Sequence, residues 1–173
     1  MQFGLNCLCL GLLLISSTCW SLETDRQQPI HIQADRITVH EKQGVSFYQG
    51  NVQFTQGSLQ VKGDEVTVYL QGDVLQKVIV KGAPATMQQQ PAQDQDLVHS
   101  QAAQMEYDAV KQIVTLIDNA QVQQGPNSFA GDFIEYDTRT NTVSARKGQA
   151  EDSRVHVIIT PPPDKPAEQG TTP

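Results

Sequence analysis

The side chains of this sequence that could do chemistry are its histidines, its cysteines and its acidic pairs. Zinc sites need histidine and cysteine at short, regular spacings, and glycoside hydrolysis needs two carboxyl groups that face each other. The histidines (His31, His40, His99 and His156) show no such spacing, and Cys7, Cys9 and Cys19 all precede residue 22. The acidic pairs are Asp64-Glu65 and Asp94/Asp96. We expect no metal ion and no cofactor.

The aspartates recur within a short phrase that precedes an alternating strand. The phrase reads Ala34-Asp35-x-Ile37-x-Val39, Gly63-Asp64-x-Val66-x-Val68 and Gly131-Asp132-x-Ile134-x-Tyr136. A fourth copy, from Ala102 to Tyr107, has Ala103 in place of the aspartate. Aspartate hydrogen-bonds its own backbone in turns, so the phrase favours turn chemistry over catalysis. The chain also lacks the glycine-rich phosphate loop and the nucleophile elbow of common enzymes. We predict that the protein is not an enzyme.

A longer repeat sets the architecture. Residues 51–57 and 61–68 are echoed at residues 119–125 and 129–136, which is a spacing of 68 positions. Both copies alternate apolar and polar residues with period two and break at glycine, which predicts a β-rich unit used twice.

Short alternating segments follow one another from Ile30 to Thr160, with glycine and asparagine between them. This spacing predicts an all-β sandwich or barrel. Turns are expected at residues 42–44, 49–51, 56–58, 72–73, 125–127 and 140–141. The alternation predicts one interior parity for each strand, comprising Ile37, Val39, Phe47, Val52, Phe54, Leu59, Val61, Val66, Val68, Met105, Tyr107, Leu116, Val122, Phe129, Ile134 and Tyr136.

The two ends differ in composition from the middle. Residues 1–21 carry no charge and contain an apolar run, which predicts a cleaved signal peptide; an uncleaved membrane anchor is the alternative. Residues 22–160 are the predicted β-domain, and residues 161–173 form a proline-rich tail that we expect to be disordered. The net charge of −7 argues against nucleic acid as a partner.

Several segments, in this order, resemble the LptA (OstA-like) family of periplasmic lipopolysaccharide transport proteins. They are Gln28-Pro29-Ile30-His31-Ile32, Tyr48-Gln49-Gly50-Asn51-Val52, Thr55-Gln56-Gly57, Lys81-Gly82-Ala83-Pro84-Ala85-Thr86, Ala102 to Tyr107 and Gly131 to Tyr136. The resemblance implies a twisted, incompletely closed antiparallel β-jellyroll. It also implies head-to-tail stacking into a bridge between the two membranes, with an LptC-like inner-membrane protein and an LptD-like outer-membrane protein at its ends.

The family carries lipid acyl chains in the jellyroll interior, so the resemblance implies that interior residues bind lipid. Family ligand-lining positions fall on Ile30, Met87, Tyr107 and Ala109. The candidate lipid-binding residues are Ile30, Ile37, Val39, Phe47, Phe54, Val61, Val68, Met87, Met105, Tyr107, Leu116, Phe129, Ile134 and Tyr136.

Three other interpretations fit parts of the pattern. The chain could be the membrane-anchored, LptC-like partner, which shares the fold. It could be a structural or carbohydrate-binding β-sandwich, although its four tyrosines are scattered along the sequence. A β-helix lyase would repeat every 20 to 25 residues, unlike the uneven spacing between positions 35, 64, 103 and 132.

Overall fold

A computed structural model describes residues 25–92, 94–149 and 153–161, and within them one antiparallel sheet of ten strands. Two short 3-10 turns, η1 (Asp25–Gln27) and η2 (Glu41–Gln43), accompany it. The strands are β1 (His31–Gln33), β2 (Arg36–His40), β3 (Val45–Gln56), β4 (Leu59–Gln71), β5 (Val74–Gln89), β6 (Val98–Asp108), β7 (Ile113–Gln124), β8 (Asn127–Asp137), β9 (Thr142–Arg146) and β10 (His156–Ile158). The predicted signal peptide and almost all of the proline-rich tail lie outside the described residues.

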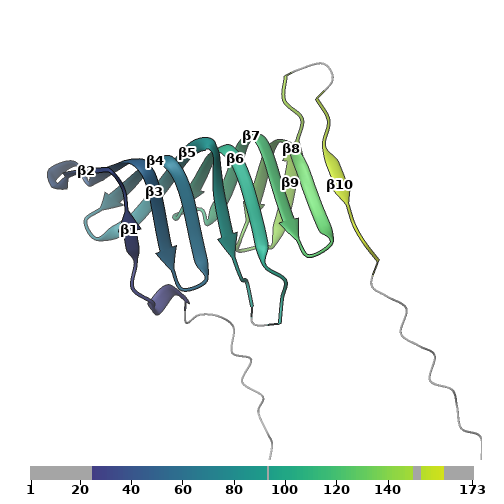
Figure 1. Cartoon of the computed structure of the whole chain (residues 1–173), viewed down its shortest axis with the longest axis horizontal. Helices are drawn as coiled ribbons and strands as arrows, with labels where there is room; N and C mark the ends of the chain where they lie inside the picture. The colour runs from purple at the N-terminus through teal and green to yellow at the C-terminus, as the bar shows by residue number, and fades with distance from the viewer. Residues whose placement is uncertain (1–24, 93, 150–152, 162–173) are drawn as a thin grey trace, which may run out of the picture.

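The strands follow one another along the molecule almost in chain order. The path runs β1-β3-β4-β5-β6-β7-β8-β10, with β2 also paired to β3 and β9 also paired to β8 (Figure 1). β1 and β2 therefore share one end of the sheet, and β9 and β10 share the other. The sheet does not close into a barrel, because these end strands do not pair with each other. The predicted all-β, incompletely closed antiparallel fold is confirmed.

Each long strand bends near its middle. The pairing register shifts between Gln49 and Val52 on β3, between Lys62 and Glu65 on β4, and between Ile117 and Ala120 on β7. Extra residues at such bulges kink a strand and increase its local twist. The shifts continue across β5 and β6, so the bends form a line across the whole sheet.

The bends correct two sequence predictions. Gly50-Asn51 was predicted as a turn, but the two residues form a bulge inside β3, both with positive φ. The phrases at Gly63-Asp64 and Gly131-Asp132 also lie inside strands, β4 and β8, rather than in turns between them. A bulge and a turn use the same residue types, because both need a backbone that leaves the extended region. Strands β3 and β4 therefore each join two of the short alternating segments that the sequence predicted.

The line of bends divides the sheet into two halves that face each other. We call them the β2–β9 half-sheet and the β1–β10 half-sheet, after their end strands. The first contains residues 45–49 of β3 and 65–69 of β4, and the second contains residues 53–56 and 59–62 of the same strands. The β1–β10 half-sheet is in front in Figure 1.

The 68-residue repeat is a unit of four strands. Adding 68 to the first residues of β3, β4 and β5 gives the first residues of β7, β8 and β9. β1 and β2 together correspond to β6, which is continuous where Ala102-Ala103 replaces Ala34-Asp35. Duplication of this unit extends one curved sheet without a second core.

The core lies beside the bends. Its fully buried apolar members include Val52, Ala85, Ala102, Leu116 and Ile134. Half-buried side chains from the β1–β10 half-sheet, such as Val61 and Phe129, pack against this cluster. Burial therefore holds the two halves together along their common edge, and it decreases with distance from the bends.

Phe47 was predicted to be interior, and this prediction is wrong. Phe47 pairs with Thr38 and Thr67 on the outer face, is 37% exposed, and makes an edge-to-face contact with His40 at 5.8 Å. β3 keeps one parity through its bulge, so the inward residue beside Phe47 is the buried Ser46. Because the inward residue Ser46 is polar, the apolar pattern of β3 indicated the wrong face for Phe47.

Ile37 and Val39 were also predicted to be interior, and although they lie on the interior face they are 52% and 55% exposed. Both share a face with interior residues, since Ile37 pairs with Tyr48 and Val39 pairs with Ser46. They are exposed because β2 is the end strand and no further strand covers them.

Asp64 and Asp132 are repeat equivalents that differ in their contacts, and this difference predicts different mutational effects. The pKa of Asp132 is lowered from its ordinary value of 3.8, because the Ser153 hydroxyl and the Gly148 amide donate hydrogen bonds to the carboxylate. Asp64 is exposed at its bulge. We expect Asp64→Asn to leave the melting temperature unchanged, because asparagine suits the same backbone, and Asp132→Asn to lower it at pH 7.

A carboxylate with a depressed folded-state pKa stabilises the fold above its unfolded pKa, and this contribution is lost as pH falls through the folded pKa. The melting-temperature difference between wild type and Asp132→Asn should therefore shrink as the pH falls below about 3.8. Thermal melts from pH 2 to pH 7 measure it. An equal loss for Asp64→Asn and Asp132→Asn would contradict this account of the bends.

Candidate functional site

The inner face of the sheet carries three apolar rows that run across the strands. The row nearest the bends in the β2–β9 half-sheet is Ile37, Tyr48, Val66, Val80, Met105, Leu116, Ile134 and Ala145. The next row is Val39, Ser46, Val68, Val78, Tyr107, Val114, Tyr136 and Val143. The β1–β10 half-sheet opposes them with Ile32, Phe54, Val61, Met87, Ser100, Val122, Phe129 and Val157.

The three rows line a trough between the half-sheets. Strands in a sheet lie about 4.8 Å apart, so a row that crosses eight of them spans roughly 34 Å. Except for Ser46 and Ser100, every side chain in the rows is apolar or a tyrosine. The trough is therefore a long apolar surface rather than a compact pocket.

Burial within the trough decreases from the bends toward the opening. Val66, Val80, Met105, Leu116 and Ile134 are buried. In the two rows farther from the bends, most side chains, such as Val68, Tyr107, Phe54 and Val122, are only half-buried. Large half-buried apolar side chains that face each other across an opening offer surface to an apolar ligand.

The trough is open at both ends of the sheet. At one end Ile37 and Val39 are exposed, and at the other Val143 and Val157 are 46% and 47% exposed. The end strands β2 and β10 have no buried residue. Natural edge strands are normally protected by charges, proline or a covering segment, whereas these edges present apolar residues that continue the interior rows.

The structure brings together most of the predicted lipid-binding residues. Twelve of the fourteen lie in the three rows. The exceptions are Phe47, on the outer face, and Ile30, which precedes β1 and is 55% exposed. Sequence reasoning missed Ile32, Tyr48, Val78 and Val114, which share these rows. The 68-residue repeat contained the signal for one of them, because Tyr48 and the predicted Leu116 are equivalent positions.

Aspartates at the hairpin ends were another omission. Asp108 accepts hydrogen bonds from the amides of Val110 and Lys111, and Asp137 accepts them from Arg139 and Thr140. These bonds lower the pKa of both carboxyl groups. Asp108 and Asp137 therefore make the side-chain-to-backbone hydrogen bonds that were expected of the aspartates in the repeated phrase.

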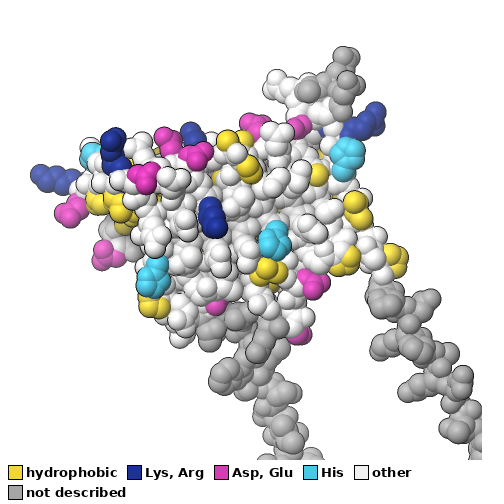
Figure 2. Space-filling model, viewed as in Figure 1, with side chains coloured by type: hydrophobic (Ala, Val, Ile, Leu, Met, Phe, Trp, Pro, Cys, Tyr) yellow, Lys and Arg dark blue, Asp and Glu magenta, His cyan; other side chains and the backbone are white. Residues whose placement is uncertain are grey.

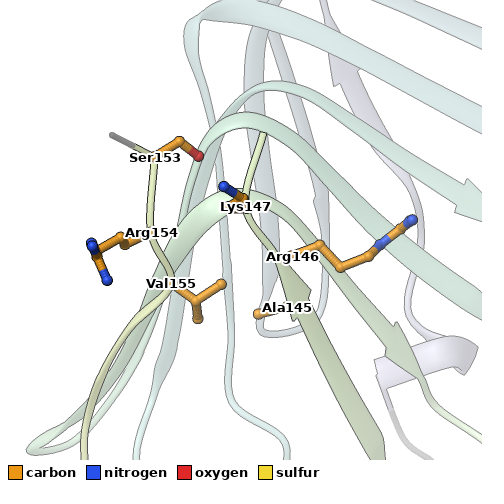
Figure 3. A pocket seen from close by; sticks show the side chains of 6 residues that line it. All are labelled: Ala145, Arg146, Lys147, Ser153, Arg154 and Val155. Carbon is orange, nitrogen blue, oxygen red and sulfur yellow. The ribbon is translucent and has the colours of Figure 1, made fainter. Parts of the chain in front are cut away.

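A hollow of about 390 Å³ lies between β9 and β10, lined by Ala145, Arg146, Lys147, Ser153, Arg154 and Val155. Arg146 and Arg154 point to opposite sides of it (Figure 3), and the Arg146 guanidinium lies 3.9 Å from the centre of the Phe133 ring. The cations do not converge on one point, and the described residues of the lining include no carboxylate. The described lining therefore forms neither an anion site nor the carboxyl pair of a glycosidase.

Among the described residues, no three His, Cys, Asp or Glu side chains gather in a way that could hold a metal ion. No helix in the same part of the chain is long and apolar enough to cross a membrane.

Comparison with known proteins places most of the described sequence in one family. Residues 31–142 match the family described as LptA/(LptD N-terminal domain) LPS transport protein. The chain belongs to the LptA family. The match covers the first copy of the four-strand unit and the second copy up to the first residue of β9. The resemblance expected from the sequence is confirmed.

Relatives within the LptA family are similar over most of their length. The lipopolysaccharide export system protein LptH of Pseudomonas aeruginosa is 40% identical over 142 residues, which cover 81% of this chain and 79% of LptH. The lipopolysaccharide export system protein LptA of Escherichia coli K12 is 31% identical over 169 residues, covering 93% of this chain and 90% of that protein.

A solved structure shares the fold. It is the crystal structure of the same P. aeruginosa LptH, described as the LptA-homologous periplasmic component of the lipopolysaccharide transport device. Its TM-score is 0.71 at 36% sequence identity, and the match covers 79% of this chain and 99% of that one.

Proposed function

We propose that this protein binds lipopolysaccharide in the periplasm and carries its acyl chains in the trough toward the outer membrane. The observation that carries the proposal is the set of three apolar rows, half-buried at the opening and uncovered at both ends. Each methylene removed from water contributes about 0.8 kcal/mol, so a lipid with several acyl chains needs a long continuous surface of this kind. Membership of the LptA family, whose relatives are lipopolysaccharide export proteins, supports the same function.

In this proposal, the residues that contact lipid lie in the two trough rows that are farther from the bends. They include Phe54, Val61, Val68, Met87, Tyr107, Phe129 and Tyr136, all half-buried. Buried residues such as Ile134 serve the core instead. Phe47 is excluded, because it lies on the other face of β3.

The proposed partners follow from the open ends. Within the described residues, the two ends of the sheet (β1 and β2 at one end, β9 and β10 at the other) have edges with no further strand, and exposed apolar residues lie at both ends. Two different edges that pair with each other make a heterologous contact, which extends into a filament. We include in the proposal a head-to-tail homo-oligomer, an LptC-like inner-membrane protein at one end and an LptD-like outer-membrane protein at the other, each joined by strand addition.

The proposal also keeps the domain boundaries drawn from the sequence. In this proposal, residues 1–21 are a signal peptide that directs export, residues 22–160 form the binding domain, and residues 161–173 are a proline-rich tail. The proposed role is transport, and no catalytic step is part of it.

We expect Phe54→Asp to reduce lipopolysaccharide binding at least tenfold while the domain stays folded. Phe54 is half-buried in the trough, so the carboxylate keeps some contact with water but places a charge beside the acyl chains. The neighbouring Gln53→Asp is the matched control, because Gln53 is exposed on the opposite face. Thermophoresis with labelled lipopolysaccharide and residues 22–173 measures the affinity, and circular dichroism verifies the fold. Equal affinity for Phe54→Asp and Gln53→Asp would refute the trough as the binding surface.

A further inference from the structure

The outer face of the β1–β10 half-sheet carries a second, polar surface. A hollow of about 650 Å³ extends over β4 to β8 and β10 on this face. The middle of this face is largely free of charged side chains, apart from one basic residue (Figure 2). Most of the lining side chains lie on the face opposite the trough, and Met87, Ser100, Val122 and Phe129 of the trough row complete the lining.

Two rows of side chains form the floor of the hollow. One row contains Gln60, Gln88, His99 and Gln123, and the other contains Lys62, Thr86, Gln101 and Gln121. The Gln101 amide nitrogen donates to the Gln121 side-chain oxygen at 3.2 Å, which fixes the orientation of both amides. Lys62 is the only lysine or arginine in the lining, and no Asp or Glu is present there.

We propose that this hollow binds a linear, uncharged oligosaccharide that lies across the strands. Each glutamine amide offers both a donor and an acceptor, as sugar hydroxyls do. Adjacent glutamines along a row are about 4.8 Å apart, and the two rows are separated by about 6.6 Å along the strands. A sugar ring fits between the rows, and successive rings meet successive strands.

Other ligand classes fit the hollow less well. A protein partner would need the aromatic and apolar anchors of a typical interface core. Met87, Val122 and Phe129 of the lining belong to the trough-facing row, which leaves Ile158 as the one large aliphatic side chain on this face of the described lining and no aromatic one. Nucleic acid would need several lysines or arginines for its phosphates, and the lining has one. Neutral hydrogen bonds to sugar replace bonds to water and contribute little net affinity, and no aromatic platform adds to them. Binding is therefore weak and quickly reversed.

The test is a titration of isotope-labelled residues 22–173, followed by NMR of backbone and glutamine side-chain amides. Two probes distinguish the possible sources of such a chain: polysaccharide released from lipopolysaccharide without its acyl chains, and chitotetraose as a cell-wall-like glycan. We expect saturable shifts at Gln101, Gln121 and His99 with at least one probe. Q101A/Q121A should weaken that binding at least fivefold, and Gln123→Ala at least twofold. Gln71→Ala, an exposed strand glutamine outside the hollow, should change it less than twofold.

The proposal is overturned by saturable binding to neither probe, by equal affinity in Q101A/Q121A, or by shifts confined to the trough. The acyl-free probes do not need the trough, so failure here leaves the proposed lipid binding untouched. Conversely, Phe54→Asp should retain glycan binding while it loses lipopolysaccharide.

Discussion

Ile134→Asp is expected to lower the free energy of unfolding of the sheet by about 3–5 kcal/mol. Ile134 is 2% exposed and lies between Leu116 and Ala145 in the row nearest the bends. The buried carboxylate would have no basic partner in this row, and an unpaired buried charge costs about 3–5 kcal/mol. Domains of this size are stable by about 5–15 kcal/mol, so the change removes a large part of the total.

Urea unfolding followed by circular dichroism measures this effect. Thr67→Asp is the matched control, because Thr67 lies on the outer face between Phe47 and Ile79, and it should shift the midpoint only slightly. If Ile134→Asp and Thr67→Asp had the same unfolding midpoint, the half-sheets would not be held together by this row.

Removal of residues 155–173 should abolish rod formation while the domain stays folded and binds lipopolysaccharide. The deletion removes β10, whose three residues are all exposed, together with the exposed Ile159. β10 pairs only with residues 128–130 of β8, so its loss takes no residue from the buried core but removes an edge from the open end. Removal of residues 161–173 alone should leave rods intact, because a proline-rich segment cannot donate a regular hydrogen-bond ladder.

Light scattering over a concentration series measures assembly, and circular dichroism verifies folding. If rods persist without residues 155–173, the strand that docks the next protomer would be β9, the other end strand, and not β10. Loss of rods in the 161–173 deletion would assign a role to the tail that the sheet geometry does not predict.

Much of the fold was predictable because it is local and repeated. Alternation and the 68-residue echo identified the strands around Val52, Val66 and Ile134 and the duplication of their unit. The hairpins at Gly57, Gly72 and Gly125 were placed correctly, since glycine with positive φ is a strong turn signal. These features depend on a few adjacent residues, which a single sequence displays.

The bends and the ends of the trough were not predictable in the same way. Whether Gly50-Asn51 makes a turn or a bulge depends on how many residues β4 places opposite it, and that is a non-local register. Inward and outward side chains keep alternating through this bulge, and Phe47 therefore lies on the outer face. The exposure of Ile37 and Val39 depends on which strand ends the sheet. The alternation of apolar and polar residues within a strand does not show which strands lie beside it.

The candidate site was partly predictable for the same reason. Residues such as Phe54, Val61 and Phe129 were correctly grouped by their shared face, but the sequence did not separate those that form the core from those at the opening. The difference between buried Met105 and half-buried Tyr107 comes from distance to the line of bends. The sequence does not show this distance, because it is set only when the strands bend and the two half-sheets face each other.

The most direct test of the account compares two phenylalanines on one strand. A photoreactive benzoylphenylalanine at position 54 faces the trough, and at position 47 it faces the outside of the same strand, β3. Phe129 and Phe133 form a second such pair on β8. Irradiation of each variant with lipopolysaccharide should yield a crosslinked product at positions 54 and 129 and none at positions 47 and 133. Equal crosslinking at positions 47 and 54 would contradict the claim that the trough holds the acyl chains.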